Sequence, residues 1–99
     1  MIIITGRMTI PDENKDQFFT ISKRQVDLSR LEEGCLNYWL YEDSFEPGKF
    51  FFYEEWESRD AVDFHFKQSY CLEFVEALRK LTQGKPAMHI RTIAERPKK

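Results

Sequence analysis

The spacing of apolar residues changes along the chain between a strand-like and a helix-like period, and these changes predict six segments. Apolar runs typical of strands occupy residues 2–10, 35–43, 50–57 and 87–95. Helical spacing covers residues 13–32 and residues 58–81, with a break near Ser69 that divides the second region into two pieces. The order strand, helix, strand, strand, helix, strand is the split β-α-β-β-α-β, ferredoxin-like arrangement. It predicts an α+β fold, an antiparallel sheet with helices on one face.

Turn and capping residues separate these segments. Pro11 ends the first strand, the pair Pro47-Gly48 predicts a hairpin turn, and Ser58 is a good helix N-cap. In the first helix the expected buried stripe is Phe18, Ile21, Leu28 and Leu31, with Gln25 as a polar interruption. In the last helical piece it is Cys71, Phe74, Val75, Leu78 and Leu81.

Both faces of the predicted sheet carry large rings. Alternation places Cys35, Asn37, Trp39 and Tyr41 on one face of the second strand, and Leu36, Tyr38 and Leu40 on the other. In the third strand Phe50, Phe52, Glu54 and Trp56 oppose Phe51, Tyr53, Glu55 and Glu57. Helices can cover only one face, and an uncovered aromatic face favours association. We therefore predict a homodimer that packs sheet against sheet; the pattern does not decide whether Tyr38 faces the interior or this interface.

Composition narrows the class of protein. The 99 residues fit a single domain, residues 1–95, followed by a basic tail at 96–99. Fifteen basic and 17 acidic side chains give a net charge of −2, which argues against a nucleic-acid partner. No apolar run is long enough for a membrane span, and the N-terminus lacks the pattern of a signal peptide, so we expect a cytoplasmic protein without a membrane partner. Cys35 and Cys71 have no metal-site spacing; reduced thiols are expected, with a disulfide as the alternative.

The predicted hairpin and the helix after it contain, in order, Glu33-Gly34-Cys35-Leu36-Asn37-Tyr38, Asp43, Phe51-Phe52-Tyr53-Glu54-Glu55-Trp56-Glu57-Ser58, Ala61 and His65. This set of segments resembles the antibiotic biosynthesis monooxygenase domain. These segments span about a third of the chain, and the order of the elements extends the resemblance over nearly all of the rest. It implies a dimeric α+β barrel with a pocket between sheet and helices in each subunit.

The family has branches with different chemistry. It includes cofactor-independent monooxygenases, haem-degrading enzymes and an isomerase of a phosphorylated quorum-sensing signal. The positions that match the Asn, Trp and His of the haem-degrading branch are Gly6, His65 and Val75, and valine cannot ligate iron. The isomerase branch stays open, because segments 32–34, 53–54 and 60–65 resemble it as well.

Oxygenation without a cofactor needs a base, a hydrogen-bond donor for the developing anion and a dry pocket. His65 is the candidate base, although a structural histidine is the competing interpretation. Trp56 and Tyr38 are the candidate donors, because each carries one polar hydrogen on an apolar body. Further candidates for substrate contact are Asn37, Phe52 and Glu54. A buried Glu54 could act as acid or base; an ion pair with Arg7 or Arg91 is the alternative.

The sequence therefore predicts a cofactor-independent monooxygenase of a small electron-rich cyclic substrate, such as a quinol, that reacts through a deprotonated intermediate. The expected partners are this small molecule and a second copy of the chain, and no cofactor or metal is expected. The alternatives are an isomerase of a small hydroxyketone, with or without a phosphate group, and a dimer that binds a small ligand without chemistry.

Overall fold

The computed structural model describes residues 1–93 and contains four strands, three α-helices and one short 3-10 helix. In chain order the elements are β1 (Ile2–Thr9), η1 (Asp12–Asn14), α1 (Lys15–Arg30), β2 (Cys35–Glu42), β3 (Lys49–Trp56), α2 (Arg59–Phe66), α3 (Ser69–Leu81) and β4 (Ala87–Thr92). The predicted order is thus confirmed, with the break in the second helical region between α2 and α3. The last two residues of the predicted strand 87–95 and the tail 96–99 lie outside the described residues.

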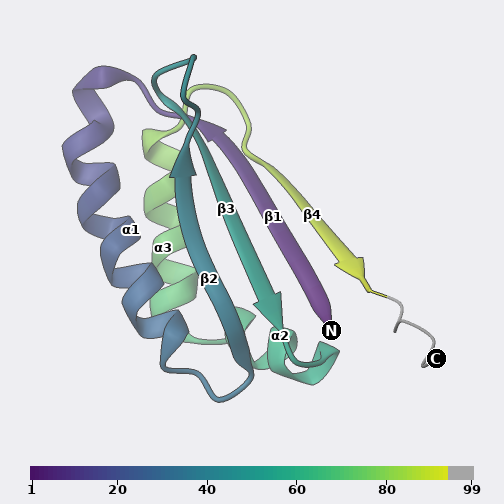
Figure 1. The fold of residues 1–99 in the computed structure, drawn as a ribbon. Coiled ribbons are helices and arrows are strands. Elements are labelled where there is room, and N and C mark those ends of the chain that lie inside the picture. The colour runs from purple at the N-terminus through teal and green to yellow at the C-terminus, as the bar shows by residue number, and fades with distance from the viewer. Residues whose placement is uncertain (94–99) are drawn as a thin grey trace.

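The four strands form one antiparallel sheet in the order β2-β3-β1-β4. Figure 1 shows α1 and α3 side by side on one face of this sheet, with α2 at the end where β3 stops. In the described part of the chain, the other face of the sheet carries no helix. The α+β, ferredoxin-like fold predicted from the sequence is therefore confirmed.

Two local features fix the connections beside the sheet. Ser58 caps α2, because its Oγ accepts a hydrogen bond of 3.2 Å from the Ala61 backbone N–H. Gly48 ends the β2–β3 turn with a φ of +89°, and its carbonyl accepts from the Ile10 N–H at 2.8 Å. A Cβ at Gly48 would lie 2.9 Å from the Ile10 oxygen, so the predicted Pro-Gly turn needs glycine for space as well as for φ.

The buried face of α1 differs from the predicted stripe. Its buried side chains are Phe18, Ser22, Gln25 and Ser29. Leu31, predicted to be buried, follows the last helical turn and is 81% exposed. Ser22 and Ser29 lie on the face of α1 that packs on β2 and α3. Larger side chains at these positions would need additional space between the closely packed elements. In α3 the predicted stripe is confirmed except at Val75, which is 46% exposed.

A β-bulge between Cys35 and Asn37 changes the alternation at the start of β2. Cys35 pairs with Trp56, a residue of the helix-covered face, and Leu36 is half exposed, which corrects the predicted faces at these two positions. From Asn37 onward the prediction holds. Tyr38 is buried on the helix-covered side, so the open question of its direction is settled in favour of the interior.

Aromatic rings fill the space between the sheet and the helices. Phe18 of α1 lies 4.6 Å from Phe50 and 6.4 Å from Phe52, measured between ring centroids. Phe52 in turn meets Phe74 of α3 edge to face at 5.6 Å. These contacts connect α1, β3 and α3 through side chains with little conformational freedom.

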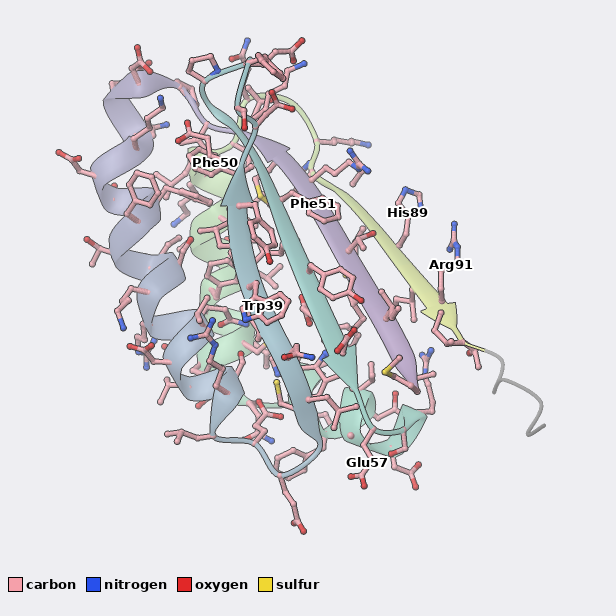
Figure 2. All side chains as sticks on the ribbon, viewed as in Figure 1. Trp39, Phe50, Phe51, Glu57, His89 and Arg91 are labelled. Carbon is pink, nitrogen blue, oxygen red and sulfur yellow. The ribbon has the colours of Figure 1, made fainter. Side chains whose placement is uncertain are left out.

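The helix-free face of the sheet, which we call the open face, also carries rings (Figure 2). Trp39 stacks on Tyr53 with centroids 6.3 Å apart, and the Arg7 guanidinium lies 4.9 Å from the centre of the Phe51 ring. Trp39 is 40% exposed and Tyr41 is 49% exposed. The open face is therefore an aromatic surface that no other element of the described chain covers.

Neither cysteine is paired, since Cys35 and Cys71 are free thiols. Within residues 1–93 no helix has the length and hydrophobicity to cross a membrane.

Candidate functional site

A cavity of about 230 Å³ lies between the sheet and the α2–α3 pair. Its walls are formed by Ile4, Gly6, Met8, Gln25, Tyr38, Phe52, Glu54, His65, Phe66, Cys71, Phe74, Val75, Leu78, Pro86, Ala87 and Met88. The side chains in these walls that carry polar atoms are buried, whereas Val75 and the segment 86–88 are exposed. The cavity is therefore closed on the side of its polar groups and reaches the surface near the start of β4.

His65 is held at the polar end by contacts to both ring nitrogens. The Ser58 cap sets the start of α2, so His65 shares a helix face with Ala61 and Val62 and is only 1% exposed. Nδ1 lies 2.7 Å from Glu32 Oε2, and Nε2 lies 3.6 Å from Cys71 Sγ in the cavity wall. Burial lowers the pKa of His65, with Glu32 acting in the opposite direction. The imidazole is thus neutral at pH 7 and can accept a proton.

Trp56 supports this end of the cavity from behind. The side chain is fully buried, and its ring lies 4.4 Å from the His65 ring, measured between centroids. The indole Nε1–H donates to Glu54 Oε1 at 2.9 Å. Trp56 does not line the cavity. Its indole N–H, predicted to face the substrate, is donated to the neighbouring Glu54 carboxyl group instead.

Glu54 is a buried carboxyl group in the cavity wall, 7% exposed. Burial raises the pKa of Glu54 to about 7, although the hydrogen bonds from Trp56 and Tyr38 act to lower it. The predicted alternative, an ion pair with Arg7 or Arg91, is wrong. Arg7 lies over Phe51 on the open face, and Arg91 pairs with Ile3 two strands away and is exposed. Alternation along β1 and β4 directs both arginines away from Glu54.

Tyr38 and Phe52 come from neighbouring strands and form the wall beneath His65. Their rings meet edge to face at 5.9 Å, and Tyr38 lies equally far from the His65 ring. The Tyr38 hydroxyl accepts a hydrogen bond of 3.2 Å from Gln25 Nε2. Burial raises the pKa of Tyr38 well above its usual range, so the phenol is neutral and keeps its proton, which it donates to the Glu54 carboxyl group in the free protein.

Asn37 does not line this cavity, and its contact with a substrate stays a prediction. It follows the bulge and pairs with Glu55 on the open face, where its amide donates to the Glu55 carboxylate. The structure thus brings together four of the six predicted site residues in one cavity: His65, Tyr38, Phe52 and Glu54. It places Trp56 behind the wall and Asn37 on the opposite side of the sheet.

Three polar residues around His65 were not predicted to belong to a site. Gln25 was predicted only to interrupt the apolar stripe of the first helix. In the structure its amide lies in the cavity wall, so the polar residue within an apolar stripe was the sequence feature that marked this position. Cys71 was assigned to the core; burial raises the pKa of its thiol, and Gln25 Nε2 lies 3.7 Å from its sulfur. Glu32 belongs to the segment 32–34 that resembles the isomerase branch, but no role was predicted for its side chain, because its partner is 33 residues away in the chain. Within residues 1–93 no three His, Cys, Asp or Glu side chains are grouped as metal ligands.

Known proteins share both the sequence pattern and this architecture. The family model described as antibiotic biosynthesis monooxygenase matches residues 1–77. An uncharacterized protein of Synechocystis, sll1783, is 36% identical over 95% of this chain, and the match spans 64% of the length of that protein. A crystal structure of an antibiotic biosynthesis monooxygenase superimposes with a TM-score of 0.87 at 25% identity, over 96% of this chain and 100% of that one.

A second similar structure shows the fold alone, because its sequence identity is low. A mutant form of SnoaB, a cofactor-independent oxygenase from Streptomyces nogalater, superimposes with a TM-score of 0.83 at 17% identity, over 96% of this chain and 94% of that one. The match to the family model covers more than three quarters of the 99 residues and agrees with the observed fold. The chain belongs to the antibiotic biosynthesis monooxygenase family.

Proposed function

We propose that this protein is a cofactor-independent monooxygenase that oxidises a small electron-rich cyclic substrate, such as a quinol. The observation that carries the proposal is a neutral, buried His65 in the wall of a largely apolar cavity, with Nε2 beside Cys71 of the same wall. Membership of the family supports a monooxygenase-type reaction. SnoaB, which shares the fold, is a cofactor-independent oxygenase, so this architecture accommodates such chemistry.

In the proposed reaction His65 Nε2 takes the proton of a phenolic hydroxyl group. The resulting anion is electron-rich enough to pass an electron to O2, and recombination of the two radicals forms a peroxide on the ring. Loss of water then leaves a carbonyl group: one oxygen atom stays on the ring, and the other leaves as water with two hydrogens from the substrate. The apolar wall around Phe52 excludes bulk water, which would otherwise quench the anion.

Glu54 and Tyr38 are suited to the oxygen atom that carries the developing charge. With a pKa of about 7, Glu54 is partly protonated at neutral pH, and a protonated carboxyl group can donate a hydrogen bond. The Tyr38 phenol is neutral and adjacent. In this proposal both groups stabilise the substrate anion, while Trp56 holds the Glu54 carboxyl group in place.

An isomerase of a small hydroxyketone is the second candidate, favoured by the presence of two acid–base groups in one cavity. His65 could take a proton from one carbon atom and Glu54 could return a proton to its neighbour. A phosphorylated substrate fits less well, because the cavity walls contain no lysine or arginine among residues 1–93.

Oxygen consumption separates these candidates. A panel of quinols and hydroxyketones is incubated with the protein, with and without O2, and both oxygen uptake and product mass are followed. We expect O2-dependent turnover of at least one quinol and a gain of one oxygen atom in its product. Turnover at the same rate without O2 would identify the isomerase, and binding without turnover would identify a ligand-binding protein.

The role of His65 is tested with two histidine variants. His65→Ala removes the proposed base, and we expect kcat to fall by about 10²–10⁴-fold. His89→Ala is the matched control, because His89 is exposed on β4, away from the cavity, and labelled in Figure 2. An equal effect of both variants, or none of either, would exclude His65 as the base.

We also infer that the open face packs against a second copy of the chain. Trp39, Tyr41 and Tyr53 form a continuous set of rings on this face, with the Trp39 centroid 6.3 Å from each of the other two. The face also carries side chains of opposite charge, Arg7 over the Phe51 ring and Glu55 beside Tyr53. A two-fold pairing buries the same face of both copies and so covers the rings with one contact.

A further inference from the structure

The side chain of Glu32 lies between the cavity and a second hollow on the outside of the molecule. Glu32 belongs to the loop between α1 and β2. The residues that line the outer hollow include Glu32, Tyr70, Leu31, Phe64 and Glu57. Of these, Glu57 is labelled in Figure 2, beside α2. His65 lines the cavity but not this hollow. The contact between Glu32 and His65 therefore lies between the cavity and the outer hollow.

One carboxylate oxygen of Glu32 has two polar contacts. Oε2 lies 2.7 Å from His65 Nδ1, and it accepts a hydrogen bond from the Tyr70 hydroxyl group. The side chains of the Glu32–His65 pair are almost fully buried, 2% exposed for His65 and 9% for Glu32. The other oxygen, Oε1, has no hydrogen-bond partner within residues 1–93. Burial of a carboxylate is unfavourable because the charged group loses its hydration, so compensating contacts are expected around it.

The backbone next to Glu32 is shaped for this contact. Gly34 packs against α2 so closely that a Cβ at this position would lie 2.3 Å from the Ala61 Cβ. Ala61 is one helical turn before His65 on the same face of α2. The close approach of Gly34 therefore brings the loop, and with it Glu32, beside the His65 ring.

The geometry points to Glu32 as the positioning residue for His65, and we propose that it holds the imidazole in the Nδ1–H form, with the lone pair of Nε2 on the side of Cys71 in the cavity wall. When Nε2 takes the proton of the substrate, the ring becomes a cation, and the adjacent carboxylate stabilises it. Tyr70 restrains the carboxylate from the other side. This inference rests on the proposed function only for the identity of the proton donor; the tautomer of His65 is a property of the free protein.

Other titratable groups face His65 from three further elements. They are Tyr38 of β2, Glu54 of β3, and Tyr70 and Cys71 of α3. Tyr38, Tyr70 and Cys71 are neutral at pH 7, because their pKa values are raised by burial. Within residues 1–93, Glu32 and Glu54 are thus the two carboxyl groups near the ring, and of these two only Glu32 contacts a ring nitrogen of His65.

Nitrogen-15 NMR of the free protein tests the proposal without any substrate. The imidazole shifts of His65 are followed against pH in the parent protein, Glu32→Gln, Glu32→Ala and the control Glu33→Gln, which changes the neighbouring exposed acid of the same hollow. We expect the Nδ1–H form in the parent. Glu32→Gln should keep this form, because the amide oxygen still accepts, but lower the pKa of His65 by about one unit or more through the loss of charge. Glu32→Ala should lose both the tautomer and the charge effect.

An insensitive His65 would overturn the proposal. If Glu32→Ala leaves the tautomer and the pKa of His65 unchanged, or if Glu33→Gln moves them equally, Glu32 does not position the ring. Should Glu32→Ala fail to fold, the pKa change in Glu32→Gln decides between the same two results.

Kinetics then separate this inference from the proposed function. With an active quinol substrate, we expect Glu32→Ala to reduce kcat by about 10²-fold or more with little change in KM, and Glu33→Gln to leave both unchanged. Oxygen uptake that is equal in Glu32→Ala and the parent would overturn the inference while leaving the proposed function intact. Absence of oxygen uptake in the parent, together with the expected NMR result, would overturn the proposed function alone.

Discussion

Burial of Glu54 makes the stability of the folded protein depend on pH in a defined direction. The pKa of Glu54 rises from an ordinary value of 4.5 to about 7 because the carboxyl group is buried. Between these two values the folded state binds more protons than the unfolded state, so the free energy of unfolding falls as the pH increases. The contribution of Glu54 is fully present below pH 4.5 and is lost as the pH rises through about 7.

The size of the effect follows from the same two values. One pKa unit corresponds to about 1.4 kcal/mol, so the complete difference amounts to about 3 kcal/mol. Between pH 5 and pH 8 the protein should lose about 2–3 kcal/mol of this contribution. With an m-value in urea of about 1–3 kcal/mol per molar, the midpoint of unfolding should fall by roughly 1–2 M.

Urea unfolding of the parent protein and of Glu54→Gln, at several pH values and one fixed protein concentration, measures the effect. Glu54→Gln cannot ionise at this position, so its advantage over the parent should grow by about 2–3 kcal/mol from pH 5 to pH 8. His65 has a lowered pKa and acts in the opposite direction, since its stabilisation is lost as the pH falls below 6.5, but it is common to both proteins. Glu55→Gln, on the open face, is the control. A difference between Glu54→Gln and the parent that does not vary with pH would refute the reasoning.

Three further predictions concern packing. Phe18→Ala should lower the free energy of unfolding by about 3–5 kcal/mol, because the ring is fully buried against two other rings; thermal unfolding against the exposed-site variant Phe45→Ala measures it. Gly34→Ala should cost about 1–3 kcal/mol through its clash with Ala61, and a second substitution, Ala61→Gly, should recover part of the loss. Trp39→Ser should weaken self-association about tenfold or more in sedimentation experiments.

Each of these has a result that contradicts it. Equal stability of the Phe18 and Phe45 variants would show that the aromatic core can rearrange around a missing ring. A Gly34→Ala protein as stable as the parent would show that the loop can move away from α2 without loss. A parent protein that is monomeric at micromolar concentration would remove the basis for the Trp39 test. Leu31→Ser, which changes an exposed side chain away from the open face, is the control for association.

The order of the elements could be predicted because local signals mark them. Pro11, the Pro47-Gly48 pair and Ser58 end or begin segments for reasons within a few residues. The alternation in β3 was equally informative, since every second residue from Phe50 to Trp56 is buried. Such features depend on backbone geometry and on solvent exposure, and both are determined mainly by residues that are close in the sequence.

The remaining features depend on partners that are distant in the chain. The buried face of α1 includes Ser22 and Ser29, because close packing on neighbouring elements, and not hydrophobicity, selects small side chains there. The bulge before Asn37 shifts the alternation of β2 by one position. No glycine or proline between Cys35 and Asn37 marks it in the sequence. Glu32 reaches His65 only when the loop and α2 are brought together by Gly34. The candidate base was predictable as a residue, whereas its partner was not.

The cavity opens beside the first residues of β4, at the edge of the sheet and on the side of the helices. The rings that would join two subunits lie on the reverse side. In the proposed dimer, substrate can therefore enter each cavity and product can leave it while the two subunits stay in contact. Each copy can then complete its reaction independently of the other. Catalysis and assembly would then occupy separate sides of a single layer of strands.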